Sequence, residues 1–203
     1  IVDYAFVVAG RSDHDAKSIR QLIELAKANA GKLNYGSAGN GTTSHLAGEL
    51  LKLQAGIDLV HVPYKGGGPI QTDLMAGRVQ LYASAIIGVA PNVKSGKLKA
   101  LAVSTAKRAA AMPDVPTLDE LGIRNAEVIS WFGIMVPTGT PQTIIDTLGR
   151  IIRGSAETSD FQGQVAKLGM DPVALGPSEA QKFWQGEVDK WETVIKAAQI
   201  PLQ

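Results

Sequence analysis

The sequence lacks cysteine and is poor in aromatic residues, which make up 5% of its 203 positions. Without cysteine, the chain has no disulfide, no thiolate ligand for a metal and no thiol nucleophile. Its apolar runs are also much shorter than the ~20 residues that a membrane-spanning helix needs. Charge of one sign is missing as well, because 20 Lys and Arg residues oppose 19 Asp and Glu residues and leave a net charge of +1. Since the basic residues are scattered, we expect no nucleic-acid partner.

The chain also lacks the motifs of common catalytic and metal sites. Its three histidines, His14, His45 and His61, do not have the spacing of a metal-binding motif. It has no G-x-S-x-G nucleophile turn and no acidic pair with evident partners. We therefore predict that the protein is not an enzyme and has no catalytic residue, no metal site and no cofactor. His45 falls in the first turn of a predicted helix, where we expect its ring to fix the preceding loop.

What the chain does contain, up to Thr105, is a regular alternation of strand-like and helix-like segments. Short apolar runs typical of buried strands alternate with segments whose apolar residues recur at helical spacing. This alternation predicts crossover connections, and hence an α/β fold with a mostly parallel sheet covered on both faces. We assign residues 1–130 to one ligand-binding lobe. The strand segments are 4–9, 33–35, 59–62, 79–83 and 98–103, and the helical segments lie at 18–31, 46–56, 69–76 and 90–94.

The pattern changes after Thr105. A Pro-rich connector precedes Thr117 and Glu120, whose capping-box spacing predicts a one-turn helix ending at Gly122. Residues 128–136 are then the most strand-like stretch of the chain. Beyond them the apolar residues follow three helical stripes that cannot bury one another completely. We assign residues 131–203 to a crossover strand and helices of another lobe, and we expect the truncated chain to self-associate where these stripes lie exposed.

A Gly-rich turn within residues 35–46 is the best candidate for a binding site. Its glycines let backbone N–H groups converge, and the helix that follows offers unpaired N–H donors at its positive end. The turn lacks the lysine of a nucleoside-triphosphate loop and the G-x-G-x-x-G spacing of a dinucleotide site, so we expect a small anion such as a carboxylate. The alternative is a structural turn whose hydroxyl groups only cap the helix. The candidate ligand-binding residues of the turn are Ser37, Ala38, Gly39, Asn40, Gly41, Thr42 and Thr43.

Two further strand ends add candidate ligand-binding residues, namely Tyr64, Lys65 and Ser84. Tyr64 is placed to wall a ligand and Lys65 to balance its charge, although taken alone a tyrosine is more often half-buried packing and a lysine more often solvated surface. Ser84 lies among small residues that leave room. Because the carboxyl ends of parallel strands meet at one edge of a sheet, polar and small residues at three successive ends favour a pocket there.

Several blocks of the sequence resemble the periplasmic solute-binding receptors of tripartite tricarboxylate transporters, the Bug family. The blocks follow the order that they have in the family and extend over nearly the whole chain. They are Gly31–Ser37, Gly39–Leu46, Val60–Gly66, Gly96–Val103, Pro113–Thr117, Ser130–Gly133 and Pro137–Pro141.

The resemblance implies a type II periplasmic-binding-protein fold, in which two α/β lobes close on a small carboxylated molecule. It implies a periplasmic location, a small organic carboxylate as ligand and transporter subunits in the membrane as partners. Family members begin with a segment that this chain lacks, so we expect the second lobe complete and the first only partly present. The chain opens on Ile1 without a leader pattern, which indicates a processed or truncated start. Ser84 also stands where many members carry an aspartate, which disfavours amino-acid ligands.

Two alternatives to a receptor remain at this point. The first is an α/β enzyme that uses the Gly-rich turn to bind a phosphorylated substrate. The second is a structural or domain-swapped protein whose exposed helices pair with another chain.

Overall fold

The computed structural model describes residues 2–11, 16–167 and 170–200. The chain divides into two compact units. The large unit comprises Ala5–Ile129 and Val194–Gln203, and the small unit comprises Ile1–Tyr4 and Ser130–Thr193. The assignment of 1–130 and 131–203 to two lobes of a receptor stays a prediction.

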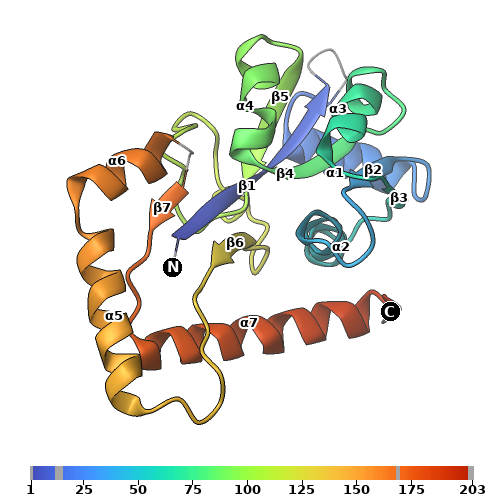
Figure 1. Ribbon diagram of the computed structural model, residues 1–203. Helices are drawn as coiled ribbons and strands as arrows, with labels where there is room; N and C mark the ends of the chain where they lie inside the picture. Colours follow the sequence, from blue (N-terminus) through green and yellow to red (C-terminus); the bar gives the residue numbers. More distant parts are fainter. Residues whose placement is uncertain (1, 12–15, 168–169, 201–203) are drawn as a thin grey trace. The chain divides into compact units, whose positions relative to one another are not determined.

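A mixed sheet forms the centre of the large unit, with the strand order β3-β2-β4-β1-β5 (Figure 1). The parallel strands are β2 (Asn34–Ser37), β3 (Val60–Pro63) and β4 (Leu81–Ala85). The strand β1 (Val2–Arg11) runs antiparallel to both of its neighbours in this sheet, β4 and β5 (Leu98–Val103). The prediction of a mostly parallel sheet is therefore wrong for β1. The prediction fails there because β1 is inserted between β4 and β5 and runs opposite to both. A crossover connection joins β4 to β5, so those two strands are parallel to each other across β1.

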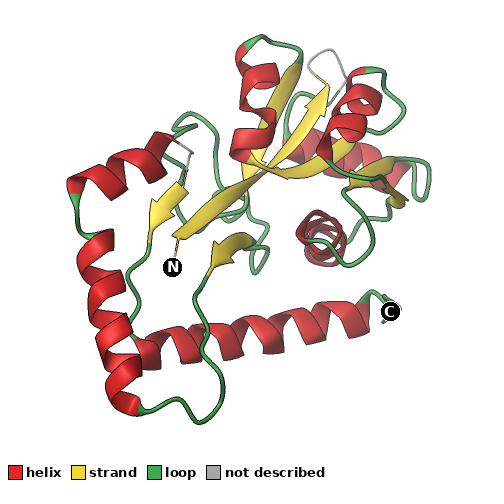
Figure 2. Ribbon diagram, viewed as in Figure 1, coloured by secondary structure: helices red, strands yellow, loops and turns green. Residues whose placement is uncertain are grey.

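Helices cover both faces of this sheet, as predicted (Figure 2). The helices α1 (Ile19–Ala28) and α2 (Thr43–Ala55) contribute to one buried apolar cluster, together with Val8 and Tyr35. The helices α3 (Gly67–Met75) and α4 (Ile86–Lys94) contribute to another, together with Val7. Because adjacent residues of β1 point into different clusters, the two clusters lie on opposite faces of the sheet.

The predicted ends of the first two helices are close to those observed. Ser18 is the N-cap of α1, and its Oγ accepts the backbone N–H of Gln21 at 3.2 Å. The helix α2 ends before Gly56, which has a φ of 61° and so takes the left-handed conformation that favours glycine.

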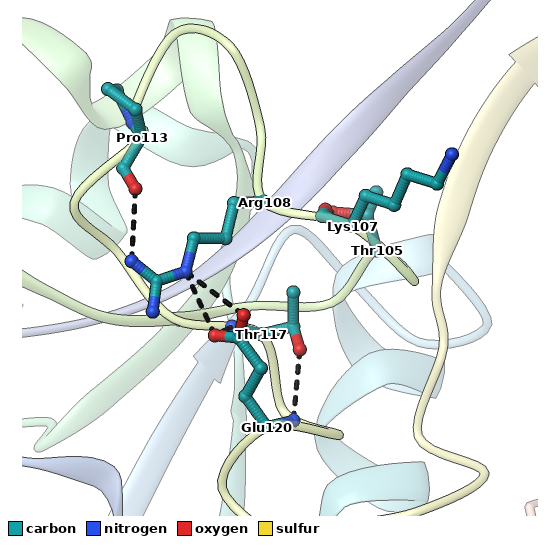
Figure 3. Close-up of polar contacts among 6 residues, drawn as sticks. All are labelled: Thr105, Lys107, Arg108, Pro113, Thr117 and Glu120. Carbon is teal, nitrogen blue, oxygen red and sulfur yellow. Dashed lines mark hydrogen bonds and ion pairs between the residues drawn. The ribbon is translucent and has the colours of Figure 1, made fainter.

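The connector after β5 contains the predicted capping box but no helix. The Glu120 N–H donates to Thr117 Oγ1 at 3.0 Å, and the Thr117 N–H donates to Glu120 Oε2 at 3.1 Å. Arg108 ties the connector together, because its Nε donates to both Glu120 oxygens and its Nη1 donates to the Pro113 carbonyl (Figure 3). The segment forms turns in place of a helix. An isolated bridge between Thr117 and Val103 holds it against β5, where the Leu118 N–H donates to the Val103 carbonyl at 3.0 Å.

The small unit is mainly helical. Its helices are α5 (Gln142–Ala156), α6 (Ser159–Lys167) and α7 (Pro177–Ala197), of which the last continues into the large unit. A strand that the sequence did not predict, β7 (Met170–Pro172), pairs antiparallel with residues 2–4 of β1.

The strand predicted at 128–136 is shorter in the structure. It is β6 (Ile129–Phe132), which pairs with β1. Beyond it the side chains of Ile134 and Met135 are 73% and 69% exposed, and no strand partner is present for them in the described ranges. High β propensity alone does not extend a strand where no neighbour accepts its hydrogen bonds.

Among the helices of the described residues, none has both the length and the apolar character that crossing a bilayer requires.

We predict that Gly48→Ala destabilises the large unit by about 2 kcal/mol. A Cβ at this position of α2 would lie 2.2 Å from Cε2 of Tyr35, which is fully buried, so the helix would have to move off the sheet. Chemical denaturation of the wild type and the variant measures the change. The matched control is Gly163→Ala in α6, where a Cβ meets nothing within 4 Å and where alanine favours the helix. Equal stability of both variants would contradict this packing.

We also predict that the chain self-associates at micromolar concentration. In the small unit Ile134, Ile144 and Ile151 are 73%, 49% and 59% exposed, and a unit that leaves several large apolar side chains exposed favours contact with another copy. Sedimentation velocity at increasing concentration measures the effect. Ile144→Lys with Ile151→Lys should return the chain to a monomer, and a chain that is monomeric throughout would refute the prediction.

Candidate functional site

The candidate residues lie at the ends of three parallel strands. Because β2, β3 and β4 run in the same direction, their carboxyl ends lie at one edge of the sheet. Ser37 and Pro63 are register partners, and the Tyr64 N–H donates to the Ser37 carbonyl at 2.8 Å. The loops that follow β2 and β3 are therefore neighbours, as predicted, and Ser84 lies near the end of the adjacent strand β4.

Residues 38–42, which we call the glycine loop, use most of their own N–H groups internally. Four of the five donate to acceptors in or beside the loop, and three of those acceptors are side chains. Most amides of the loop are therefore already hydrogen-bonded within the protein and are not open to a ligand. The acceptors are Ser44 Oγ for Ala38 at 2.9 Å, Ser37 Oγ for Gly39 at 3.2 Å, His45 Nδ1 for Gly41 at 3.0 Å and the Gly39 carbonyl for Thr42 at 3.3 Å.

The donors that remain lie at the tip of the loop and in the first turn of α2. In the part of the chain that the structure describes, the N–H groups of Asn40, Thr43, Ser44 and His45 have no acceptor. They carry the positive end of the helix dipole, which favours an anion. The hydroxyl of Thr42 donates to the Gly39 carbonyl at 2.7 Å and makes no cap bond, so the alternative of hydroxyls that only cap the helix does not describe this residue.

Three aromatic rings stack behind the loop. The rings of His45 and His61 are nearly parallel, with centroids 3.9 Å apart and an angle of 9° between their planes. The ring of Tyr35 lies beside both, with its centroid 5.0 Å from that of His61 and 6.5 Å from that of His45. The Nε2 of His61 lies 2.5 Å from Ser37 Oγ, the atom that accepts the Gly39 N–H. The rings therefore hold the loop from the side of the sheet.

Burial favours the uncharged form of both imidazoles. It is the main cause that lowers the pKa of His61 to about 4, and the neighbouring His45 lowers it further. Burial also lowers the pKa of His45, against the attraction of the Glu49 carboxylate.

A buried acid and a lysine complete this cluster. The Tyr35 hydroxyl donates to Glu49 Oε1 at 2.5 Å, and Lys52 Nζ lies 3.0 Å from both Glu49 oxygens. Burial and this bond to Glu49 raise the pKa of Tyr35, so its phenol stays protonated. The Glu49 charge is therefore balanced by one cation and one neutral donor.

The other predicted site residues are Tyr64, Lys65 and Ser84, which differ in their burial and in their hydrogen-bond partners. The Tyr64 hydroxyl donates to Asp73 Oδ2 at 2.8 Å, and hydrogen bonds from Tyr64 and Arg78 lower the pKa of Asp73. Lys65 is exposed and has no ion pair within the described ranges. Ser84 is buried, and its hydroxyl donates to the Ala85 carbonyl at 3.1 Å, so it presents no free donor to a ligand.

Sequence reasoning assigned His45 to the loop but missed the cluster around it. The sequence predicts no role for Glu49, and it predicts none for His61 beyond its place in the strand 59–62. The signal was present in the strand register, because Tyr35 and His61 are direct partners in adjacent parallel strands and Ser37 shares a face with Tyr35. No group of three or more metal-binding side chains occurs among the described residues. His14 lies outside them.

Comparison with known proteins places nearly the whole chain in one family. Residues 1–200 match the family described as the tripartite tricarboxylate transporter family receptor. A similar curated protein is the UPF0065 protein in the tcbD-tcbE intergenic region of Pseudomonas sp. (strain P51), 33% identical over 185 residues. That match covers 91% of this chain and 55% of the relative, so the chain spans about half the length of that curated protein.

Solved structures are similar over nearly the whole chain. R. palustris Rpa4515 with adipate is 31% identical with a TM-score of 0.84, and the match covers 98% of this chain and 67% of that one. The periplasmic binding protein BugD is 33% identical with a TM-score of 0.81, covering 100% and 68%. MatC (Rpa3494) from Rhodopseudomonas palustris with bound malate is 26% identical with a TM-score of 0.77, covering 96% and 67%. The periplasmic-binding-protein fold is thus shown over about two thirds of its length.

We predict that the stability of the chain falls as the pH is lowered from about 6.5 to about 4. His61 has a pKa of about 4 in the folded chain and an ordinary value of 6.5 when unfolded, so the unfolded chain binds the proton first. The contribution of neutral His61 to the free energy of unfolding is therefore fully present above pH 6.5 and is lost as the pH falls towards 4. Thermal unfolding at several pH values measures it, and His61→Gln should show a shallower fall than the wild type. Identical slopes for the two proteins would count against a buried neutral His61.

Proposed function

The chain belongs to the family of tripartite tricarboxylate transporter receptors, and on this basis we propose that it captures a small organic dicarboxylate at the glycine loop. The family is one of periplasmic binding receptors that are not enzymes. The alternative of an enzyme acting on a phosphorylated substrate is therefore set aside. The protein is a solute-binding protein, and its ligand is the subject of the proposal.

The observation that carries the proposal is the row of unpaired N–H groups at the start of α2. The N–H groups of Thr43, Ser44 and His45 lie in the first turn of α2, at the positive end of the helix dipole. The N–H of Asn40 adds a fourth donor at the tip of the loop. A carboxylate gains charge-assisted hydrogen bonds from such donors without needing an arginine. Adipate and malate in the two R. palustris structures are both dicarboxylates, which supports this class of ligand.

The neighbouring strand ends support the same class. The exposed ammonium group of Lys65 attracts anions to this edge of the sheet. Tyr64 contributes an aromatic wall whose hydroxyl is already bound to Asp73. Ser84 and the rest of β4 carry no acidic side chain that would pair with the ammonium group of an amino acid. We therefore favour diacids without an amino group over amino acids.

The proposal includes the partner and the division of labour within the chain. As a receptor of this family, the protein would deliver its ligand to membrane subunits of a tripartite transporter. Residues 1–130 would form the ligand-binding lobe, and residues 131–203 would contribute a crossover strand and helices to the opposing lobe. The structure leaves both statements as proposals, since the chain spans part of its relatives.

We predict that Thr43→Pro weakens the binding of adipate and malate by about tenfold or more. Proline removes the N–H at the first position of α2 and is otherwise tolerated there. Thr42 precedes it with φ −72° and ψ 160°, a conformation that a following proline allows. Isothermal titration calorimetry, with amide NMR shifts for weak binding, gives the affinities.

Thr43→Ala is the matched control, because it removes the side chain and keeps the N–H. We expect its affinity to stay within about threefold of the wild type, as the Thr43 side chain makes no hydrogen bond among the residues that the structure describes. A proline variant that binds as well as the alanine variant would show that the helix start does not hold the ligand.

A further inference from the structure

His45 is bound to the very loop that precedes its own helix. Its ring is 6% exposed, and its Nδ1 accepts the Gly41 N–H at 3.0 Å. Gly41 has a φ of 73°, so it lies in a left-handed turn that other residues adopt only with strain. Because a backbone N–H is the donor, Nδ1 must be the unprotonated nitrogen of the ring. This bond therefore exists only for a neutral imidazole.

His61 holds the same loop at a second point. Its Nε2 contacts Ser37 Oγ at 2.5 Å, and that oxygen also accepts the Gly39 N–H at 3.2 Å. The two imidazoles stack at 3.9 Å, so each fixes the position of the other. Gly39 and Gly41 are thus both held by the ring pair, one directly and one through Ser37. The N–H of Asn40, which lies between them, is left without an acceptor in the part of the chain that the structure describes.

We propose that His45 and His61 are positioning residues for carboxylate binding, and that the site binds its ligand only while the His45 ring is uncharged. The proposal rests on the proposed function and adds its regulation by pH. Neither ring touches the ligand in this scheme. Each acts through the backbone of the glycine loop, which presents Asn40 and the first turn of α2.

Protonation of His45 removes this support. A proton on Nδ1 of His45 places a donor opposite the Gly41 N–H, and the bond between them is lost. The glycine loop is then free to leave its binding conformation. A charge on His61 cannot readily accompany one on His45, because two charged rings 3.9 Å apart repel each other strongly.

The surrounding groups decide how far acidification must go. From α2, the Glu49 carboxylate favours protonation of the rings, while Lys52 opposes it. From β2, the Tyr35 phenol is neutral and donates to Glu49, which weakens the attraction of that carboxylate for the rings. The one titratable side chain of β4, Tyr82, packs in the cluster on the opposite face of the sheet. Burial outweighs these charges and lowers the pKa of both histidines, so the change falls on the acidic side of neutrality.

The test compares two substitutions of His45 at pH 7.5 and pH 5.0, with adipate and malate as probes. His45→Asn places an oxygen acceptor near the position of Nδ1 and does not titrate. His45→Phe keeps an aromatic ring and removes the acceptor. Thermal unfolding without ligand reports whether each variant is folded, and amide NMR titration reports binding. The carboxyl groups of the probes titrate in the same range, but they do so equally for every protein compared at one pH.

We expect His45→Phe to bind about fivefold or more weakly than the wild type at pH 7.5, and His45→Asn to recover most of that loss. We expect the wild type to lose affinity between pH 7.5 and 5.0 by a larger factor than His45→Asn. Equal affinity of the phenylalanine variant and the wild type would overturn the proposal. So would equal losses of affinity for the wild type and the asparagine variant on acidification.

A second measurement separates this inference from the proposed function. If the wild type binds neither diacid at either pH, the proposed function fails, and the claim about carboxylate binding fails with it. The hold of the rings on the loop is still tested in the free protein by the amide resonances of Gly39 and Gly41. These should shift as the two rings titrate, and should shift less in His61→Gln. Resonances that do not move while the rings titrate would refute the hold itself. Unmoved resonances would refute it even if the diacids bind. Resonances of Gly39 and Gly41 that shift in His61→Gln as much as in the wild type would refute it as well.

Discussion

The contact between Tyr35 and α2 sets the geometry of the candidate site. The phenol ring lies against Gly48, where no Cβ keeps the helix away from the sheet, and the hydroxyl reaches the buried Glu49 carboxylate. Because Tyr35 belongs to β2, these two contacts dock the helix directly behind the loop that joins them. The histidine stack and the direction of the first turn of α2 both follow from this docking.

The glycine loop combines two properties that are usually opposed. Left-handed glycines make a sharp turn possible but leave the backbone poorly constrained, and here side chains supply the constraint. Ser37, Ser44 and His45 accept N–H groups of the loop, and Thr42 donates to one of its carbonyls. An anion then meets donors that are already ordered, which reduces the entropy lost on binding.

Much of the fold could be predicted from local patterns. Strand β5 has the predicted bounds, Ser18 caps α1, and Gly56 ends α2, because capping residues and glycines act within a few positions of themselves. The direction of β1 and the short length of β6 could not be predicted this way. Both depend on which strand lies alongside, and hydrophobic alternation carries no information about the neighbour.

The sequence by itself determined the alternation of strands and helices, the position of the Gly-rich turn and the absence of thiol chemistry. Each of these depends on residue types and their spacing along the chain. Only the tertiary structure decided which amides of the turn are occupied and which remain open. That outcome depends on Ser37, His45 and His61, which approach the loop from two strands and a helix, and on burial that keeps the two rings neutral. Contacts between residues distant in sequence arise from packing, and packing is settled only when the whole unit folds.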